Sequence, residues 1–332
     1  MKKIIFSWFA LMFLSAAVFA LPSVKMTIKV LNESGQPIEG ATAGLTFSYT
    51  PTGGSPKTSS SKGLTDVNGL FVGTGDSIQY FTYWATKEGY YSTTKKFRLS
   101  KITGIPGFRS WEPWNQTIEV VLKKKENPIA MYAVRMKSKD SKYLPTFPFL
   151  DRFVGYDLVA GDWMTPHGQG THRDIMFKFE KYHAKGRTDH HVKLTMAFSN
   201  EGDGLLSYYT DPNRGSKLRL PHHAPITGYE PQLVIDKHRT KTKILSGAFR
   251  DDQNYFFRIR TEKDNKGNII SALYGKIYDP IELGLFIGDK NPTGSVFFDY
   301  YLNPTSNDTN VEFDPKKNLF KDLTVNEEVS MP

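Results

Sequence analysis

Apolar and polar residues alternate along many short stretches of this chain. In the clearest of them, residues 24–30, Val24, Met26, Ile28 and Val30 are separated by two lysines and a threonine. A period of two residues places one set of side chains in a core and the other in solvent, as in a half-buried β-strand. Because no window shows a sustained helical period with helix caps, the pattern predicts an all-β protein.

Further strands follow at short intervals, separated by turns rich in Gly, Pro, Asn and Asp. The predicted strands cover residues 42–49, 78–86, 93–99, 117–123, 129–136, 154–158, 175–179, 192–198, 205–210, 255–261, 269–277 and 296–302, and a tight turn at residues 65–71 leads into another strand. Two segments, residues 50–63 and 101–116, are predicted as loops because turn-forming residues or prolines interrupt them. Short strands with turns at this spacing are typical of β-sandwiches.

A charged junction, Lys-Lys-Lys-Glu-Asn-Pro at residues 123–128, marks the predicted domain boundary. We expect a β-sandwich over residues 21–124 and a second β-rich region over residues 125–332. The second region is either another sandwich or an elaborated extension of the first.

The first twenty residues have the layout of a secretory signal. Lys2 and Lys3 precede an apolar run at residues 4–19, and Val-Phe-Ala at 18–20 suits a signal peptidase. The run is too short for a comfortable membrane span. We therefore expect cleavage after Ala20 and a mature chain in the periplasm or the medium, with no integral membrane span.

Composition narrows the expected partners. The formal charge is +9, or +7 once Lys2 and Lys3 are removed, and cysteine is absent, so neither disulfides nor a lipid-modified cysteine can form. A basic exported protein is expected to meet anionic glycans, lipid head groups or acidic proteins rather than nucleic acid. Alternatively, the charge serves solubility alone.

Three motifs in the first region carry a resemblance. Val-Leu-Asn-Glu-Ser-Gly-Gln-Pro-Ile-Glu-Gly-Ala (30–41), Thr-Asp-Val-Asn-Gly-Leu-Phe (65–71) and Lys-Glu-Gly-Tyr-Tyr (87–91) are turn-centred. Together they resemble the carboxypeptidase regulatory-like domain, over residues 22–124. The resemblance implies a transthyretin-like (prealbumin-like) sandwich and a non-catalytic accessory module, and it carries over no active-site residue.

The second region resembles a family of exported bacterial proteins through residues 155–163, 254–261, 300–308 and 312–320. In that family a regulatory-like sandwich precedes an uncharacterised β-rich region. This resemblance covers most of the mature chain and implies its architecture, but no activity.

Two groups of residues are candidates for ligand binding. Trp111 and Trp114 lie in a proline-interrupted segment and could form a platform for a sugar ring, or else cover the end of the sandwich. In the glycine-rich segment 161–170, Trp163 could stack on a sugar while Asp162 and His167 bind its hydroxyls. The alternative there is that the glycines only shape a connection between strands.

The histidines are crowded into one part of the chain. All eight fall in one interval, at His167, His172, His183, His190, His191, His222, His223 and His238. Imidazole is the commonest metal ligand, so this crowding predicts a possible metal site.

The adjacent pairs are the best nuclei for such a site: His190 with His191, and His222 with His223. Asp174 is the first candidate carboxylate partner, and Asp189 and Asp162 are further candidates. Neighbouring residues on a strand face opposite sides, so each pair offers one ligand per side. No His-Glu-x-x-His motif is present, and the histidines could equally be structural or surface residues.

The function predicted from sequence is non-catalytic: an exported binding or accessory protein, with glycan or cell-envelope material as the ligand. No catalytic residue is assigned, because no Gly-x-Ser-x-Gly elbow, phosphate loop or other cofactor motif occurs. One alternative is a metal-dependent hydrolase that uses the cluster from His167 to His238. A second is a scaffold that contacts other proteins through sheet edges.

Overall fold

The computed structural model describes residues 21–50, 54–105, 108–136, 143, 146–186, 188–211, 215–246, 250, 252–286 and 293–332. The predicted signal segment, residues 1–20, lies outside the described residues. Among the described residues, the regular structure is β-strand apart from a 3-10 helix at Pro315–Lys317, which confirms the predicted all-β class. No helix among the described residues is long and apolar enough to cross a membrane.

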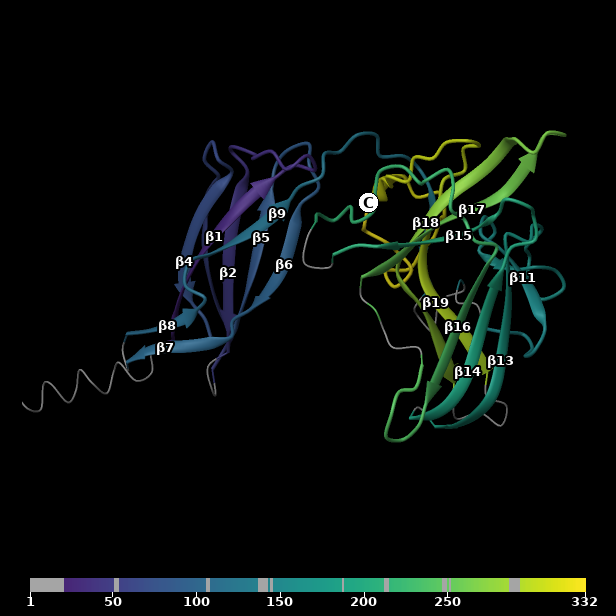
Figure 1. The fold of residues 1–332 in the computed structure, drawn as a ribbon, viewed down its shortest axis with the longest axis horizontal. Coiled ribbons are helices and arrows are strands. Elements are labelled where there is room, and N and C mark those ends of the chain that lie inside the picture. The colour runs from purple at the N-terminus through teal and green to yellow at the C-terminus, as the bar shows by residue number, and fades with distance from the viewer. Residues whose placement is uncertain are drawn as a thin grey trace, which may run out of the picture. The chain divides into compact units, whose positions relative to one another are not determined.

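The chain divides into two compact units (Figure 1). Unit 1 contains the described residues of Met1–Lys125 and Asn213–Arg219, and unit 2 contains those of Glu126–Pro212 and Leu220–Pro332. The short segment that returns to unit 1 is held by backbone and side-chain bonds: Lys217 N–H donates to the Ser92 carbonyl at 2.9 Å, and Thr93 Oγ1 donates to the Gly215 carbonyl at 3.2 Å. The domain boundary predicted at residues 123–128 does not indicate that Asn213–Arg219 belongs to unit 1.

Unit 1 is a β-sandwich. Its first sheet has the order β4-β1-β8-β7, with β9 parallel to β1, and its second has the order β3-β2-β5-β6. The strands are β1 (Ser23–Leu31), β2 (Thr42–Tyr49), β3 (Lys57–Leu64), β4 (Leu70–Asp76), β5 (Tyr80–Thr86), β6 (Thr93–Arg98), β7 (Lys101–Ile105), β8 (Phe108–Glu112) and β9 (Gln116–Val121). The alternating apolar residues of β1 face Leu45, Phe47 and Phe81 of the other sheet in one core.

Both segments predicted as loops in this unit contain strands, so that prediction was wrong. Residues 57–64 form β3, an edge strand that pairs along its whole length with β2. Residues 101–105 and 108–112 form the hairpin of β7 and β8. β3 is made of Ser, Thr, Lys, Gly and Leu and is largely exposed, so no alternation of apolar residues announces it. Pairing with a neighbour, rather than burial, makes these segments strands.

The turn before β4 needs a glycine at position 69. Gly69 has φ +73°, and a Cβ atom there would lie 2.4 Å from the Val30 carbonyl oxygen. Gly35 has a similar φ of +75°, but it has no atom within 4 Å of such a Cβ. We expect Gly35→Ala to lower the free energy of unfolding by about 1 kcal/mol and Gly69→Ala by about 2–3 kcal/mol, measured by urea denaturation. Equal losses would mean that backbone conformation alone, not the close contact, matters at Gly69.

Unit 2 is a second sandwich with an additional covering layer. We call β10-β19-β18-β17-β15 the central sheet and β12-β11-β13-β14-β16 the outer sheet. The strands are β10 (Tyr132–Arg135), β11 (Phe153–Asp157), β12 (Asp162–Trp163), β13 (Ile175–Gly186), β14 (Asp189–Ala197), β15 (Gly204–Tyr209), β16 (Gln232–Arg239), β17 (Gln253–Lys263), β18 (Ile269–Phe286) and β19 (Thr293–Leu302).

The central sheet is buried on both faces. One face packs against the outer sheet in a core that includes Phe177, Leu194, Phe257 and Phe298. On the other face, residues of the C-terminal segment such as Phe313 pack in a separate core, together with Leu220 and Ala224. The outer sheet therefore has one face toward the core and one face that carries polar side chains. That polar face and the edge at β16 hold the candidate sites.

Candidate functional site

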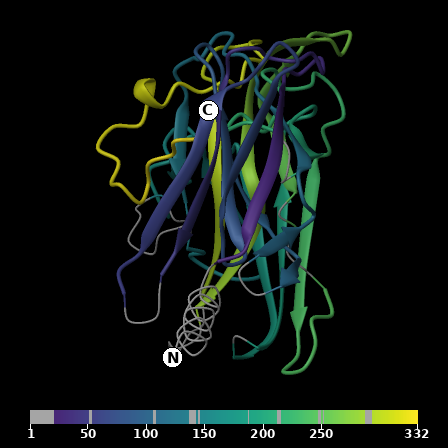
Figure 2. The same ribbon diagram turned by 90° about the vertical axis from the view of Figure 1, so that its left-hand side faces the viewer.

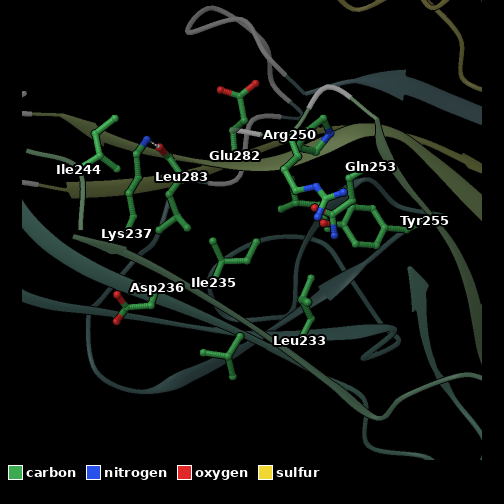
Figure 3. A pocket seen from close by; sticks show the side chains of 13 residues that line it. Leu233, Ile235, Asp236, Lys237, Ile244, Arg250, Gln253, Tyr255, Glu282 and Leu283 are labelled. Atoms are coloured by element: carbon green, nitrogen blue, oxygen red, sulfur yellow. Dashed lines mark hydrogen bonds between the residues drawn. The ribbon is translucent and has the colours of Figure 1, made fainter. Parts of the chain in front are cut away.

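A pocket of about 460 Å³ lies in unit 2, between β16 at the edge of the outer sheet and β17 and β18 of the central sheet (Figure 3). Leu233 and Ile235 of β16 form one apolar wall, and Ile281 and Leu283 of β18 lie opposite. Tyr255 of β17 closes one side, and burial raises the pKa of its hydroxyl above the ordinary value. Polar side chains, among them Gln253 and Glu282, also contribute to the lining, so the pocket suits an apolar group flanked by polar ones.

The cations at the pocket already have partners. Lys237 Nζ donates to the Leu283 carbonyl at 3.3 Å. The Arg250 guanidinium makes two bonds to Asp252, at 3.1 and 2.9 Å, and lies over the Tyr209 ring at 4.7 Å. These contacts place positive charge at the rim of an apolar space, an arrangement that can bind a ligand but offers no paired nucleophile and base.

Beside the pocket, part of the β16 backbone has no partner among the described residues. Hydrogen-bonding direction alternates along a strand, and the groups of Glu230 and His238 point away from β14: Glu230 pairs with Leu205, and the His238 carbonyl accepts from Leu245 and Ser246. By the same alternation, the N–H and C=O groups of Gln232, Val234 and Asp236 also point away from β14. Within the described residues, no backbone partner for these three outward groups is present.

The surface around this open edge is apolar. Val234 is 49% exposed, and the segment that returns after β16 adds Ile244 at 54% and Leu245 at 49%. Figure 2 shows β16 in green with this return segment below it. The turn between them exposes three basic residues, Arg239, Lys241 and Lys243. Exposed apolar residues gathered beside an unpaired edge are typical of an interaction site.

The outer face of the same sheet carries a row of three histidines. His183 of β13 is the direct register partner of His191 of β14, and His191 is the partner of His238 of β16. The rings of His191 and His238 are stacked, with centroids 4.3 Å apart and planes 10° apart. The His183 ring lies 6.3 Å from that of His191 and 5.8 Å from that of His238.

Two carboxylates anchor this histidine row. His191 Nε2 lies 3.0 Å from Asp236 Oδ2, and His183 Nε2 lies 3.2 Å from Asp189 Oδ1. Ser246 Oγ donates to Asp236 Oδ1 at 2.5 Å. Hydrogen bonds from Ser246 and His191 hold the pKa of Asp236 below its ordinary value. The row is thus an organised network of imidazoles and carboxylates.

The histidine pairs predicted as a metal site are not brought together. His190 faces the core, where it is 6% exposed and its Nδ1 lies 3.3 Å from the Gly186 carbonyl; burial lowers its pKa. His222 is buried and His223 lies 3.2 Å from Thr309 Oγ1, in the segment that covers the central sheet. Among the described residues, no three His, Cys, Asp or Glu side chains are arranged as they stand to hold a metal.

The predicted sugar-binding residues lie in different surroundings. Trp111 and Trp163 are only 5% and 6% exposed, and their indole N–H groups donate to the carbonyls of Ser77 and Thr146. Asp162 accepts from the backbone N–H groups of Trp163 and Gln169. Of the set, Trp114 and His167 are exposed, the first in unit 1 and the second in unit 2. The two buried rings have no open face on which a sugar could stack.

Asp174, a predicted metal ligand, instead bonds to an arginine. Arg260 donates from Nε to Asp174 Oδ1 at 2.8 Å and from one terminal nitrogen to Asp174 Oδ2 at 2.9 Å and Asp157 Oδ1 at 3.1 Å. Burial raises the pKa of Asp174 against the pull of the guanidinium. The pKa of Asp157 lies below its ordinary value. Burial of this carboxyl acts to raise the pKa, but hydrogen bonds from backbone N–H groups, led by that of Ala160, lower it by more. The network joins the end of β11 and the segment directly before β13 to β17.

Comparisons with known proteins assign no family. No protein-family model matches the chain, and no curated protein matches it significantly. Among solved structures, the 3-chlorocatechol 1,2-dioxygenase of Rhodococcus opacus 1CP aligns with 32% of this chain at 14% identity and a TM-score of 0.24. The catechol 1,2-dioxygenase of Pseudomonas arvilla C-1 aligns with 33% at 12% identity and a TM-score of 0.24.

The chain spans 61% and 54% of the lengths of these two dioxygenases. BcpA, the major pilin subunit of Bacillus cereus, is aligned over 82% of this chain and 95% of its own, at 12% identity and a TM-score of 0.21. TM-scores this low carry no conclusion about function. The resemblance of residues 22–124 to carboxypeptidase regulatory-like domains stays a prediction.

Proposed function

We propose that this chain is a non-catalytic binding protein whose unit 2 captures an extended segment of a partner protein along β16. The observation that carries the proposal is the stretch of backbone at Gln232, Val234 and Asp236, which has no backbone partner in the described part of the chain and lies directly beside a pocket with an apolar wall. An added strand would pair with these groups, and its inward side chains would enter the pocket. Backbone pairing supplies affinity in this mode, and the pocket supplies selectivity.

The chemistry around the edge defines the partner segment. Inward positions meet Leu233, Ile235 and Leu283, so they favour Leu, Ile, Val or Phe. The basic turn with Arg239, Lys241 and Lys243 favours acidic residues at one end of the segment. The occupant we propose is therefore an extended acidic segment in which apolar residues recur at every second position.

The setting of this binding follows from the predicted signal. The proposal places the protein outside the cytoplasm, because residues 1–20 have the layout of a secretory signal. The glycan ligand and the metal-dependent hydrolase stay predictions. A glycan would have to use the exposed Trp114 or His167 rather than the two buried tryptophans.

A matched pair of variants at Val234 tests the proposal. Val234→Pro removes an N–H that points away from β14, so it blocks pairing with a partner while sparing the sheet. Val234→Thr keeps both the N–H and the branched shape. We expect phage-displayed decapeptides selected on the wild-type protein to alternate apolar and acidic residues, and to bind Val234→Pro at least ~10-fold more weakly than Val234→Thr.

Circular dichroism and urea unfolding of both variants serve as the folding control. Selected peptides that bind Val234→Pro as well as wild type would overturn edge pairing. The proposal would also be overturned if no peptide were selected and the protein were retained on an immobilised glycan. That result would favour the glycan ligand predicted from the sequence.

A further inference from the structure

The geometry points to a transition-metal site in the histidine row: we propose that His183, His191 and His238 bind a divalent zinc or copper ion. The three histidines lie on the outer face of the sheet and do not line the pocket, although their partner Asp236 does, and the site is inferred without the proposed partner segment. Imidazole nitrogens suit zinc and copper, whereas calcium and magnesium prefer oxygen ligands.

The first step concerns where the strands place the side chains. The three histidines are direct cross-strand partners on one face, so their Cβ atoms are neighbours in a row. The backbone groups of His238 point away from β14, which makes His191 and His238 a non-hydrogen-bonded pair. In pairs of this type the side chains approach each other most closely. Two imidazoles from such a pair can reach one ion without movement of the backbone.

The second step concerns the nitrogens that remain available. His191 and His183 both use Nε2 toward a carboxylate, of Asp236 and Asp189 respectively. A carboxylate there holds the ring N–H on Nε2 and leaves the lone pair on Nδ1. Metal-bound histidines usually donate their other ring N–H to a carboxylate in this way, which fixes the ring and strengthens the ligand. Two of the three histidines have this second partner already.

The third step concerns the change that binding requires. His191 and His238 are stacked face to face, so the His238 ring must turn about its side-chain bonds, while His191 keeps its bond to Asp236, before nitrogens of both rings meet one ion. The side chain of His191 is 26% exposed and that of Asp236 is 41% exposed, so the rings border solvent rather than a packed core. The ring next to His191 on the same face is that of Tyr182, at 4.5 Å, and it is itself 55% exposed, so the rotation displaces no core residue. A water molecule would complete the coordination, as in zinc sites with three protein ligands.

The test is a metal titration of tag-free protein by calorimetry, with zinc chloride and copper sulfate in separate experiments. We expect one ion per chain. His191→Ala and His238→Ala should each weaken binding by at least ~10-fold, and Asp236→Asn by ~10–100-fold through the second partner. His223→Ala is the matched control, because it removes a histidine outside the row and should leave the affinity unchanged.

A second readout keeps the test independent of folding. Urea unfolding without metal should be similar for wild type and the row variants, and added zinc should raise the melting temperature of wild type alone. Binding that survives in His191→Ala and His238→Ala, or that is lost equally in His223→Ala, would overturn the site. Titrations that show no ion bound to the wild-type chain would overturn it as well. Comparison of the affinities for zinc and for copper shows which ion the histidine row prefers.

Discussion

Replacement of Arg260 by methionine is expected to lower the free energy of unfolding of unit 2 by about 3–5 kcal/mol at pH 7, the usual loss when one partner of a buried ion pair is removed. The side chains of Asp174 and Asp157 are 1% and 3% exposed, and Arg260 itself is 26% exposed. Without the guanidinium, two neighbouring carboxylates stay buried with no cation between them. Equilibrium urea unfolding of both proteins measures the loss.

The loss should depend on pH in a defined direction. Burial already raises the pKa of Asp174, and removing the cation raises this folded-state pKa further above the value in the unfolded chain, whereas Asp157 keeps the backbone N–H donors that lower its pKa. A group with a raised folded pKa favours the folded state when it is protonated and loses that contribution as the pH rises through the folded pKa. The difference between variant and wild type should therefore narrow as the pH falls from 7 toward 4.

Arg250→Met is the matched control for this variant. Arg250 also makes two bonds to one carboxylate, that of Asp252, but its side chain is 57% exposed. Exposed pairs of this kind contribute little because water solvates both partners when the pair is broken. If Arg260→Met lost no more stability than Arg250→Met, the buried network would not be a stabilising feature of unit 2.

Trp163→Ala is the second variant with a large expected effect, a loss of about 3–5 kcal/mol. The Trp163 ring packs against those of Phe147, Tyr156 and Phe177 at centroid distances of 5.5, 5.3 and 5.9 Å. Its indole N–H also donates to the Thr146 carbonyl at 3.0 Å. Truncation leaves a cavity in the core and a carbonyl without its donor, so the melting temperature and the urea midpoint should both fall.

Trp114→Ala provides the contrast, because Trp114 is 47% exposed. Substitutions at such positions usually change stability by less than ~0.5 kcal/mol. A stable Trp163→Ala protein that had lost affinity for a polysaccharide would contradict the buried position of this ring and support the platform predicted from sequence.

Sequence reasoning works best for strands with one buried face. Residues 24–30 and 42–49 are predicted as strands and correspond to β1 (Ser23–Leu31) and β2 (Thr42–Tyr49). β3, β7, β8, β12 and β16 were not predicted. β3, β12 and β16 are edge strands, and β7 and β8 pair with each other across a stretch of sequence that contains Pro106 and Gly107. Such strands are defined by pairing with neighbours distant in sequence, which a local pattern does not contain.

The candidate sites also depend on pairing between strands that are distant in sequence. The crowding of histidines is visible in the sequence, but the set that meets is selected by strand register. A bulge between Lys181 and His183 brings His183 opposite His191, and β16 adds His238. The bond between Arg260 and Asp174 likewise joins positions 86 residues apart. Only the alternation of Leu233, Ile235 and Lys237 hints in advance that β16 has an inner face.

The two proposed sites share β16, and this limits how the protein can evolve. Leu233, Ile235 and Lys237 project from the face that packs on the core, whereas Val234, Asp236 and His238 project from the other face, although Val234 and Asp236 also contribute to the pocket lining. Insertion or deletion of a single residue would exchange the two faces and remove both sites together. Natural variants of this strand should therefore differ by substitution, with its length held constant, whereas the exposed turn at residues 240–243 is where changes in length would be tolerated.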